Sequence, residues 1–422
     1  MHVEHASPTL PSARAARYEP FIEGIRGLLA SYVVFHHVYS VLGSFNAGDR
    51  EPLAPYLDWF SYGHNAVAAF IFVSGLCLGL PVVRRLEAGE PPLSGGAVRF
   101  YKARARRILP AYYAVIVVCV TIGLLLARTG IAMPNDYFLP LQPSAVVGGL
   151  LLVPNFFSSA NGVGVIWSLG VELQIYLLFP LMCWFWRRSG LAALLCLTLV
   201  LASLCGKYMP RDVGPLHLTG STRGLLPTFY VVFVMGLIAA KLLRGSSATA
   251  VALRERLPWG VLLLTSIIVM FMRDFVFGLR GDMNDYLIGF YMLLVTLTVY
   301  RHRAVRWVLE RPIPVQLGTF SYSLYLTHLM VITLTYLFIY QRLMPANMQG
   351  QFFRAFMFMI AVGYPLACGV AWIFARLFEW PFMNSRARKA ATTHYRPPDQ
   401  LTPPSAPPSA GASSAVLLPT AD

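Results

Sequence analysis

The stretch FIEGIRGLLASYVVFHHVY, residues 21–39, decides the fold class, because it is apolar and long enough to cross a membrane yet carries ionisable side chains. These side chains are Glu23, Arg26, His36 and His37. An ionisable group inside a membrane-spanning helix costs about 2.5–3.5 kcal/mol, so such groups are usually paired or functional. The stretch therefore predicts a membrane helix that contributes to a site.

The composition extends this prediction to the whole chain. Of the 422 residues, 56% are hydrophobic and only 13% are charged, with a mean hydropathy of +0.58. A soluble core could not bury so many apolar runs, so a polytopic membrane protein is expected. The net charge of +15 is sufficiently explained by attraction to anionic lipid headgroups, and nothing indicates a nucleic-acid partner.

Apolar runs of about twenty residues recur along the chain and predict an all-α integral membrane protein, a bundle of about ten transmembrane helices. The expected domains are a cytoplasmic segment at 1–20, a transmembrane domain at 21–385 and a disordered, Pro/Ser/Ala-rich cytoplasmic tail at 386–422. The first twenty residues have no apolar region of a secretory signal peptide. The candidate spans are 21–42, 64–83, 109–127, 167–186, 190–206, 225–242, 257–272, 286–300, 317–340 and 355–378.

The distribution of Lys and Arg predicts the orientation. If both termini are cytoplasmic, the cytoplasmic segments hold more than twice as many of these residues as the outer loops. The apolar segment 144–157 is short and contains Pro154, so it is expected to be re-entrant or interfacial; if it spanned, every later loop would change sides. The six cysteines form no CxxC pair, and neither disulfides nor a metal site are expected.

The first span places its ionisable groups at two depths. His37 follows Arg26 by eleven residues, which gives nearly the same helix face and a separation of ~16 Å along the axis. Glu23, one turn before Arg26, can pair with it. His37 would then lie in the outer third of the span, as a candidate general base or as a buried, merely hydrogen-bonded histidine.

Two further clusters suggest partners for these groups. Glu172 lies a turn or two below the outer end of the span 167–186, which enters from outside, so its depth is expected to match that of His37. Pairing with an outer-loop arginine is the alternative. The segment RFYKARARRILPAYY, residues 99–113, is a cytoplasmic cationic patch. Such a patch either anchors the protein to lipid headgroups or binds a phosphate-rich ligand.

Six short motifs are spread over nearly the whole chain, and in combination they are specific. They are Glu23-Gly24-Ile25-Arg26 with His37, FIFVSGLCLGL with Ser74, Arg104 and Arg107 before Ile-Leu-Pro, Trp167-Ser168 with Glu172, SYSLYLTH with Tyr325 and His328, and FEWPF with Glu379. This set resembles the integral-membrane acyltransferase-3 O-acyltransferases. The chain departs from the family pattern at Glu23, where Asp is usual, and at Trp380, where a basic residue is common.

The resemblance implies transfer of an acyl group, expected to be acetyl, from cytoplasmic acyl-CoA to a hydroxyl of a carbohydrate or glycoside reached from the outer side. Acyl-CoA would be a co-substrate, with no permanently bound cofactor and no metal. His37 is the expected base and Glu172 its orienting carboxylate, with transfer either direct or through an acyl-enzyme. The expected donor-binding or supporting residues are Glu23, Arg26, Ser74, Arg104, Arg107, Trp167, Ser168, Tyr325 and His328.

Two questions stay open from the residues alone. His328 lies mid-span beside aromatic residues, where it either lines the acceptor path or forms a hydrogen bond within the bundle. Intramembrane Glu, Arg and His also build proton relays, so a proton-coupled secondary transporter is the alternative function. In either case the expected location is a bilayer, namely a bacterial cytoplasmic membrane.

Overall fold

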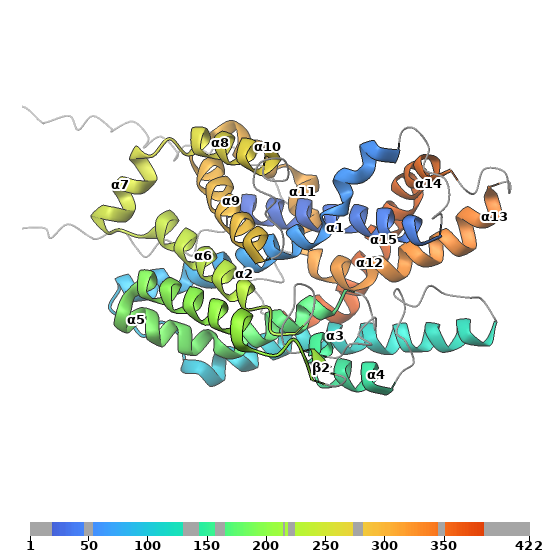
Figure 1. Cartoon of the computed structure of the whole chain (residues 1–422), viewed down its shortest axis with the longest axis horizontal. Helices are drawn as coiled ribbons and strands as arrows, with labels where there is room; N and C mark the ends of the chain where they lie inside the picture. The colour runs from blue at the N-terminus through green and yellow to red at the C-terminus, as the bar shows by residue number, and fades with distance from the viewer. Residues whose placement is uncertain are drawn as a thin grey trace, which may run out of the picture.

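The computed structural model describes residues 19–45, 54–129, 143–156, 165–213, 216–217, 224–272, 282–344 and 351–383, and these are almost entirely helical (Figure 1). The first eight α-helices are α1 (Pro20–Phe45), α2 (Gly63–Glu87), α3 (Gly96–Arg128), α4 (Pro143–Leu150), α5 (Trp167–Tyr208), α6 (Pro227–Arg244), α7 (Ala248–Arg256) and α8 (Trp259–Met272). The remaining α-helices are α9 (Asp282–Arg301), α10 (Arg303–Leu309), α11 (Pro312–Thr319), α12 (Ser321–Thr335), α13 (Gln341–Leu343), α14 (Phe352–Phe358) and α15 (Tyr364–Phe374).

Short turns of other kinds complete the described chain. The 3-10 turns are η1 (Ala54–Ser61), η2 (Pro154–Phe156) and η8 (Trp380–Phe382), and the π-helical turns are η4 (Tyr336–Tyr340), η6 (Met359–Gly363) and η7 (Ala375–Glu379). Two-residue strands β1 (Asp212–Val213) and β2 (Leu216–His217) pair antiparallel. The segments expected before residue 19 and from residue 386 onward lie outside the described residues.

Eight helical stretches among the described residues are long and apolar enough to cross a membrane. A helix can satisfy its backbone polar groups internally, which is the condition for spanning a bilayer. The chain is therefore a multi-pass integral membrane protein. The stretches are Pro20–Ser44, Tyr56–Glu87, Gly96–Arg128, Trp167–Tyr208, Pro227–Arg244, Met283–Arg301, Ser321–Leu343 and Phe352–Phe382.

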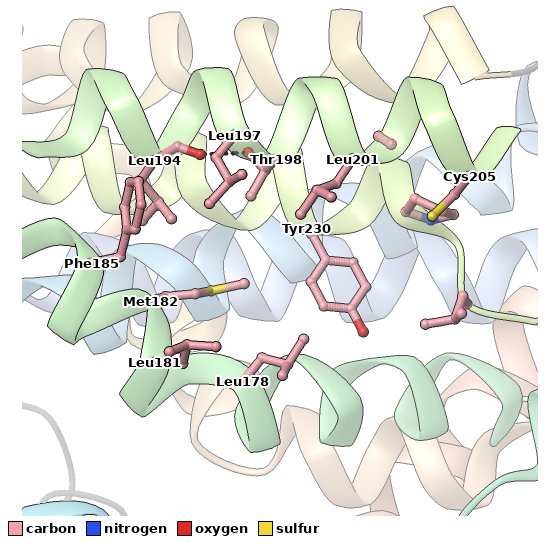
Figure 2. A pocket seen from close by; sticks show the side chains of 13 residues that line it. Leu178, Leu181, Met182, Phe185, Leu194, Leu197, Thr198, Leu201, Cys205 and Tyr230 are labelled. Carbon is pink, nitrogen blue, oxygen red and sulfur yellow. Dashed lines mark hydrogen bonds between the residues drawn. The ribbon is translucent and has the colours of Figure 1, made fainter. Parts of the chain in front are cut away.

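Helix α5 is interrupted by a kink near its middle. Gly190 has φ 85° and ψ 166°, a non-helical conformation that divides α5 into two arms. Figure 2 shows the arms beside each other. An apolar cavity of about 320 Å³ lies between the arms and α6. None of the predicted site residues lines this cavity. The sequence predicted the arms, and also the apolar region of α8, as separate spans, so the number of about ten stays a prediction.

The segment 144–157 forms no spanning helix in its described part. It contributes the eight-residue helix α4 and the short turn η2, and residue 157 lies outside the described residues. The hydroxyls of Tyr112 and Tyr113, midway along α3, donate hydrogen bonds to the carbonyl oxygens of Gly149 and Leu150. An eight-residue helix rises only about 12 Å, which is too little to cross a bilayer. The described part of this segment therefore agrees with a re-entrant or interfacial position.

Helices α2 and α6 pack with their backbones in close contact. A Cβ atom added to Gly75 would lie 2.2 Å from the carbonyl oxygen of Phe233, and one added to Gly236 would lie 2.2 Å from that of Phe72. Small residues at such crossings are the usual means of tight helix packing in membranes. The contact fixes the neighbouring Ser74 relative to the rest of the bundle.

Candidate active site

Two histidine rings from different helices meet inside the bundle. His37 lies on α1 and is half-buried, whereas His328 lies on α12 and is 0% exposed. Nε2 of His328 is 3.2 Å from Nδ1 of His37, and the two ring centroids are 4.8 Å apart. The structure thus brings together two residues that lie 291 positions apart in the chain.

Backbone carbonyl groups hold both rings through the same nitrogen. Nδ1 of His37 is 2.9 Å from the oxygen of Val33, and Nδ1 of His328 is 2.9 Å from that of Leu324. Because a carbonyl oxygen only accepts, Nδ1 of each neutral ring carries the proton. His37 then shares its Nδ1–H with the Val33 oxygen and with Nε2 of His328. The lone pair of His37 therefore lies on Nε2, which forms no hydrogen bond with any described residue, as a general base requires.

Ser168 contacts Tyr325, and Tyr325 in turn lies beside the ring of His328. The Tyr325 hydroxyl donates to the carbonyl oxygen of Val165 at 2.8 Å and accepts from Ser168 Oγ at 2.5 Å. The Tyr325 ring lies 5.9 Å from the His328 ring, measured between centroids. Ser168 and Tyr325 thus fix one wall beside the histidine pair.

Glu172 has hydrogen-bond partners of its own. Ser74 Oγ on α2 donates to Glu172 Oε1 at 2.5 Å, and the hydroxyl of Tyr176, one turn further along α5, donates to the same oxygen. Tyr176 in turn lies against Arg104, whose guanidinium carbon is 5.6 Å from the centre of the tyrosine ring. Glu172 and Ser74 therefore belong with the arginine patch of α3.

His37 and Glu172 do not form the expected base-and-orienter pair through a hydrogen bond, and the match in their depths stays a prediction. Gly63, at the start of α2, lies directly against the ring of His36, because a Cβ atom added there would be 2.1 Å from His36 Cδ2. Ser74, which holds Glu172, follows Gly63 by eleven residues, a distance of ~16 Å along α2. Glu172 hydrogen-bonds to Ser74 and Tyr176, whereas the rings next to His37 are those of His36 and His328.

Arg104 and Arg107 form no ion pair or hydrogen bond with any described residue. Both side chains are half-buried on α3, whereas Arg106 between them is exposed. Arg104 lies over the rings of Phe100 and Tyr176, at 5.7 Å and 5.6 Å from their centroids. Two half-buried guanidinium groups without a carboxylate partner among the described residues present a site suited to phosphate oxygens.

Arg26 and Glu23 pair as the sequence predicts. Arg26 NH1 lies 3.1 Å from Glu23 Oε2, and Arg26 also interacts electrostatically with Glu172 and Glu379. Glu379, at the end of η7, is 1% exposed and accepts a hydrogen bond from Ser323 Oγ at 2.6 Å. Its other oxygen has no hydrogen-bond partner among the described residues. The arginines and carboxylates of this region form one electrostatic cluster.

Sequence reasoning did not single out Tyr176 or Ser323 as site residues. Tyr176 could have been found, because it lies four residues after Glu172 and hence on the same helix face. Ser323 carries no comparable signal. Within the described residues no group of three or more His, Cys, Asp or Glu side chains is placed to hold a metal ion.

A family model described as an acyltransferase domain, Acyl_transf_3, matches residues 19–376. The chain belongs to the acyltransferase-3 family. It is therefore a membrane acyltransferase, and the match includes every predicted site residue. No curated protein and no solved structure matches the chain.

This acyltransferase-3 protein holds two polar clusters at different places along its helices. The first cluster contains the paired rings of His37 and His328. The second contains Arg104 and Arg107 with the carboxylates near them, and Arg26 on α1 lies ~16 Å from His37 along that helix. One cluster has a free imidazole nitrogen for proton transfer, and the other has positive charge for an anionic ligand.

Proposed function

We propose that the protein transfers an acetyl group from cytoplasmic acyl-CoA to a hydroxyl of a carbohydrate or glycoside on the outer side of the membrane. The observation that carries the proposal is the pairing of His37 with His328, which leaves His37 Nε2 available as a base. A sugar hydroxyl is a poor nucleophile at neutral pH, so its transfer chemistry needs such a base.

The donor would bind at the two unpaired arginines. The phosphates of CoA match the guanidinium groups of Arg104 and Arg107 in charge and geometry. The pantetheine arm would then extend between the helices and bring the thioester carbonyl toward His37, over the ~16 Å that separates the two depths along α1. Binding of a charged ligand at one end would thus place its reactive group at the other.

At the other end His37 would act on the acceptor. Nε2 of His37 takes the proton of the hydroxyl, the hydroxyl oxygen attacks the thioester carbonyl, and the carbon–sulfur bond breaks as the tetrahedral intermediate collapses. The proton on His37 then neutralises the departing CoA thiolate. His328 Nε2 accepts the Nδ1–H of His37, so His328, and not Glu172, is the residue that orients the base.

Glu172 would act on the donor side as a positioning residue. Its carboxylate accepts from Tyr176, whose ring contacts Arg104, and from Ser74 on α2. These contacts connect α2 and α5 to the guanidinium group of α3. The carboxylate thereby fixes where Arg104 presents its positive charge.

The proposal requires a defined orientation of the chain. Reporter proteins fused before Tyr18 and after Lys389 are both expected in the cytoplasm, and one fused near Asp49 on the far side, because the basic segments favour that arrangement. The measurement is the activity of a reporter that works on only one side of the membrane. Opposite results for the two termini would invalidate the sidedness assigned to donor and acceptor.

Mass spectrometry tests the proposed function in cells. Surface glycans and secreted glycosides from cells with and without the protein are compared, and an added acetyl mass is expected only when the protein is present. Cells carrying the His37→Ala variant are the matched control. Identical glycan masses in all three samples would argue against the carbohydrate acceptor.

A further inference from the structure

A hydrogen-bonded histidine and aspartate lie near the His37–His328 pair and have no part in the chemistry described above. Nε2 of His64, on α2, is 2.8 Å from Asp285 Oδ1, on α9. Asp285 is only 3% exposed, and its Oδ2 accepts from Thr228 Oγ1, on α6, at 2.7 Å. Three helices therefore fix one imidazole ring.

The contacts of His64 leave one ring nitrogen for a ligand. Because the Asp285 carboxylate accepts, Nε2 of His64 must carry the proton of this hydrogen bond. Nδ1 forms no hydrogen bond with any described residue, and 29% of the His64 side chain is exposed. The aspartate thus holds the ring in a fixed orientation, with a polar atom and part of its surface free.

The position of His64 connects it with the base. Its neighbour Gly63 contacts the ring of His36, and the His36 ring centroid is 4.8 Å from that of His37. On its other side, His64 lies parallel to Trp167, with an interplanar angle of 5° and 6.2 Å between ring centroids. Ser168, which follows Trp167, leads through Tyr325 to His328. His64 therefore flanks the histidine pair at the same end of the bundle.

Stability alone gives little reason for this arrangement. Burying a carboxylate with a histidine costs desolvation energy, and a well-packed apolar pair is often equally stable or more so. A fixed imidazole with a free nitrogen, beside the indole of Trp167, is instead the combination that binds polyols, because hydroxyls form hydrogen bonds and the C–H face of a sugar packs on an aromatic ring.

We propose that His64, held by Asp285 and Thr228, binds a second hydroxyl of a polyhydroxylated acceptor, next to the hydroxyl that His37 deprotonates. This inference rests on the proposed function. It makes His64 a specificity-determining residue, because an acceptor with a single hydroxyl could use His37 but not His64. Trp167 supplies the apolar wall against which the ring of the acceptor packs.

Two variants of His64 separate binding from a structural role. In His64→Gln the side-chain amide replaces Nε2 and keeps a donor for Asp285 but loses Nδ1. In His64→Asn the amide replaces Nδ1 and loses the contact with Asp285. The substitution His302→Gln, at an exposed residue between α9 and α10, is the matched control. Thermal unfolding of each purified variant shows whether it is folded.

The assay follows CoA release from acetyl-CoA by purified protein, with a panel of methyl hexopyranosides as the acceptor probe. His64→Gln is expected to raise the KM for the glycoside about fivefold to tenfold, the cost of one lost hydrogen bond, without a change in the KM for acetyl-CoA. His64→Asn is expected to retain more acceptor affinity than His64→Gln, and His302→Gln to match the unsubstituted protein.

Each other outcome decides against the inference. An unchanged glycoside KM in His64→Gln, or a larger loss in His64→Asn, makes the contact with Asp285 structural only. A loss of kcat as large as that of His37→Ala places His64 in the chemistry instead of in binding. If the unsubstituted protein consumes acetyl-CoA but none of the glycosides is an acceptor, the polyhydroxylated class is wrong; if it consumes no acetyl-CoA, the proposed function itself fails.

Discussion

Replacing His37 with alanine is expected to reduce acyl transfer by about 10²–10⁴-fold, the contribution that a positioned general base makes. The substitution removes Nε2, the nitrogen that the hydrogen bonds to Val33 and His328 leave available. Donor binding is expected to persist, because the arginine cluster lies ~16 Å away. The measurements are kcat for CoA release with a glycoside acceptor and equilibrium binding of a non-hydrolysable acyl-CoA analogue.

Chemical rescue separates this role from a structural one. Added imidazole can enter the space left by the His37 side chain and is expected to restore part of the activity of His37→Ala. His37→Leu fills that space and should not be rescued. Full activity of His37→Ala without imidazole, or loss of donor binding together with activity, would contradict the assignment of His37 as the base.

Replacing Arg104 and Arg107 together with alanine is expected to have the second large effect. Each charge-assisted hydrogen bond contributes about 1.5–3 kcal/mol, so the KM for acetyl-CoA should rise by about 10²-fold or more. Neither guanidinium has an ion-pair partner among the described residues, so the loss reports on the ligand and not on a broken internal salt bridge. Arg106→Ala, an exposed position on the same helix, is the matched control.

A donor without phosphates makes this test specific. The unsubstituted protein should prefer acetyl-CoA to acetyl-pantetheine, and the ratio of their kcat/KM values should approach one in the double variant. Arg106→Ala should keep the preference. If the double variant retained it too, the arginines would serve only as lipid anchors and topological signals.

The first span was predictable because its ionisable residues contrast with their apolar surroundings. The spacing of Arg26 and His37 on one helix fixes their separation, and Glu23 pairs with Arg26 as the spacing of three residues predicts. The family was predictable for a similar reason, since its motifs lie at fixed places along the chain. Features within one helix, or in local motifs, can therefore be derived from the sequence.

Contacts between helices were not predictable to the same degree. Counting from the start of α5 assumed that Trp167 lies at the membrane surface. Val165 and Ile166 before it are each only 1% exposed, so α5 begins among packed residues and its first residue does not mark a membrane surface. The pairing of His37 with His328 depends on how α1 and α12 pack, which no spacing along the chain records.

The pairing of His64 with Asp285 shows the same limit. Each residue lies close to the start of an apolar run, where polar side chains are common, so neither stands out from its neighbours in the sequence. Only the convergence of α2, α6 and α9 brings them together with Thr228. The residues proposed to bind the acceptor could therefore be identified only from the structure.

The central claim is that the protein transfers an acyl group and does not drive transport. The most direct test incubates purified protein in detergent, where no gradient exists, with acetyl-CoA labelled in the acetyl group and with carbohydrate acceptors. Label is expected to move to an acceptor hydroxyl, free CoA to appear in equal amount, and His37→Ala to reduce both by about 10²–10⁴-fold. No turnover of any acyl-CoA, together with gradient-driven uptake of a solute in vesicles, would contradict acyl transfer as the function.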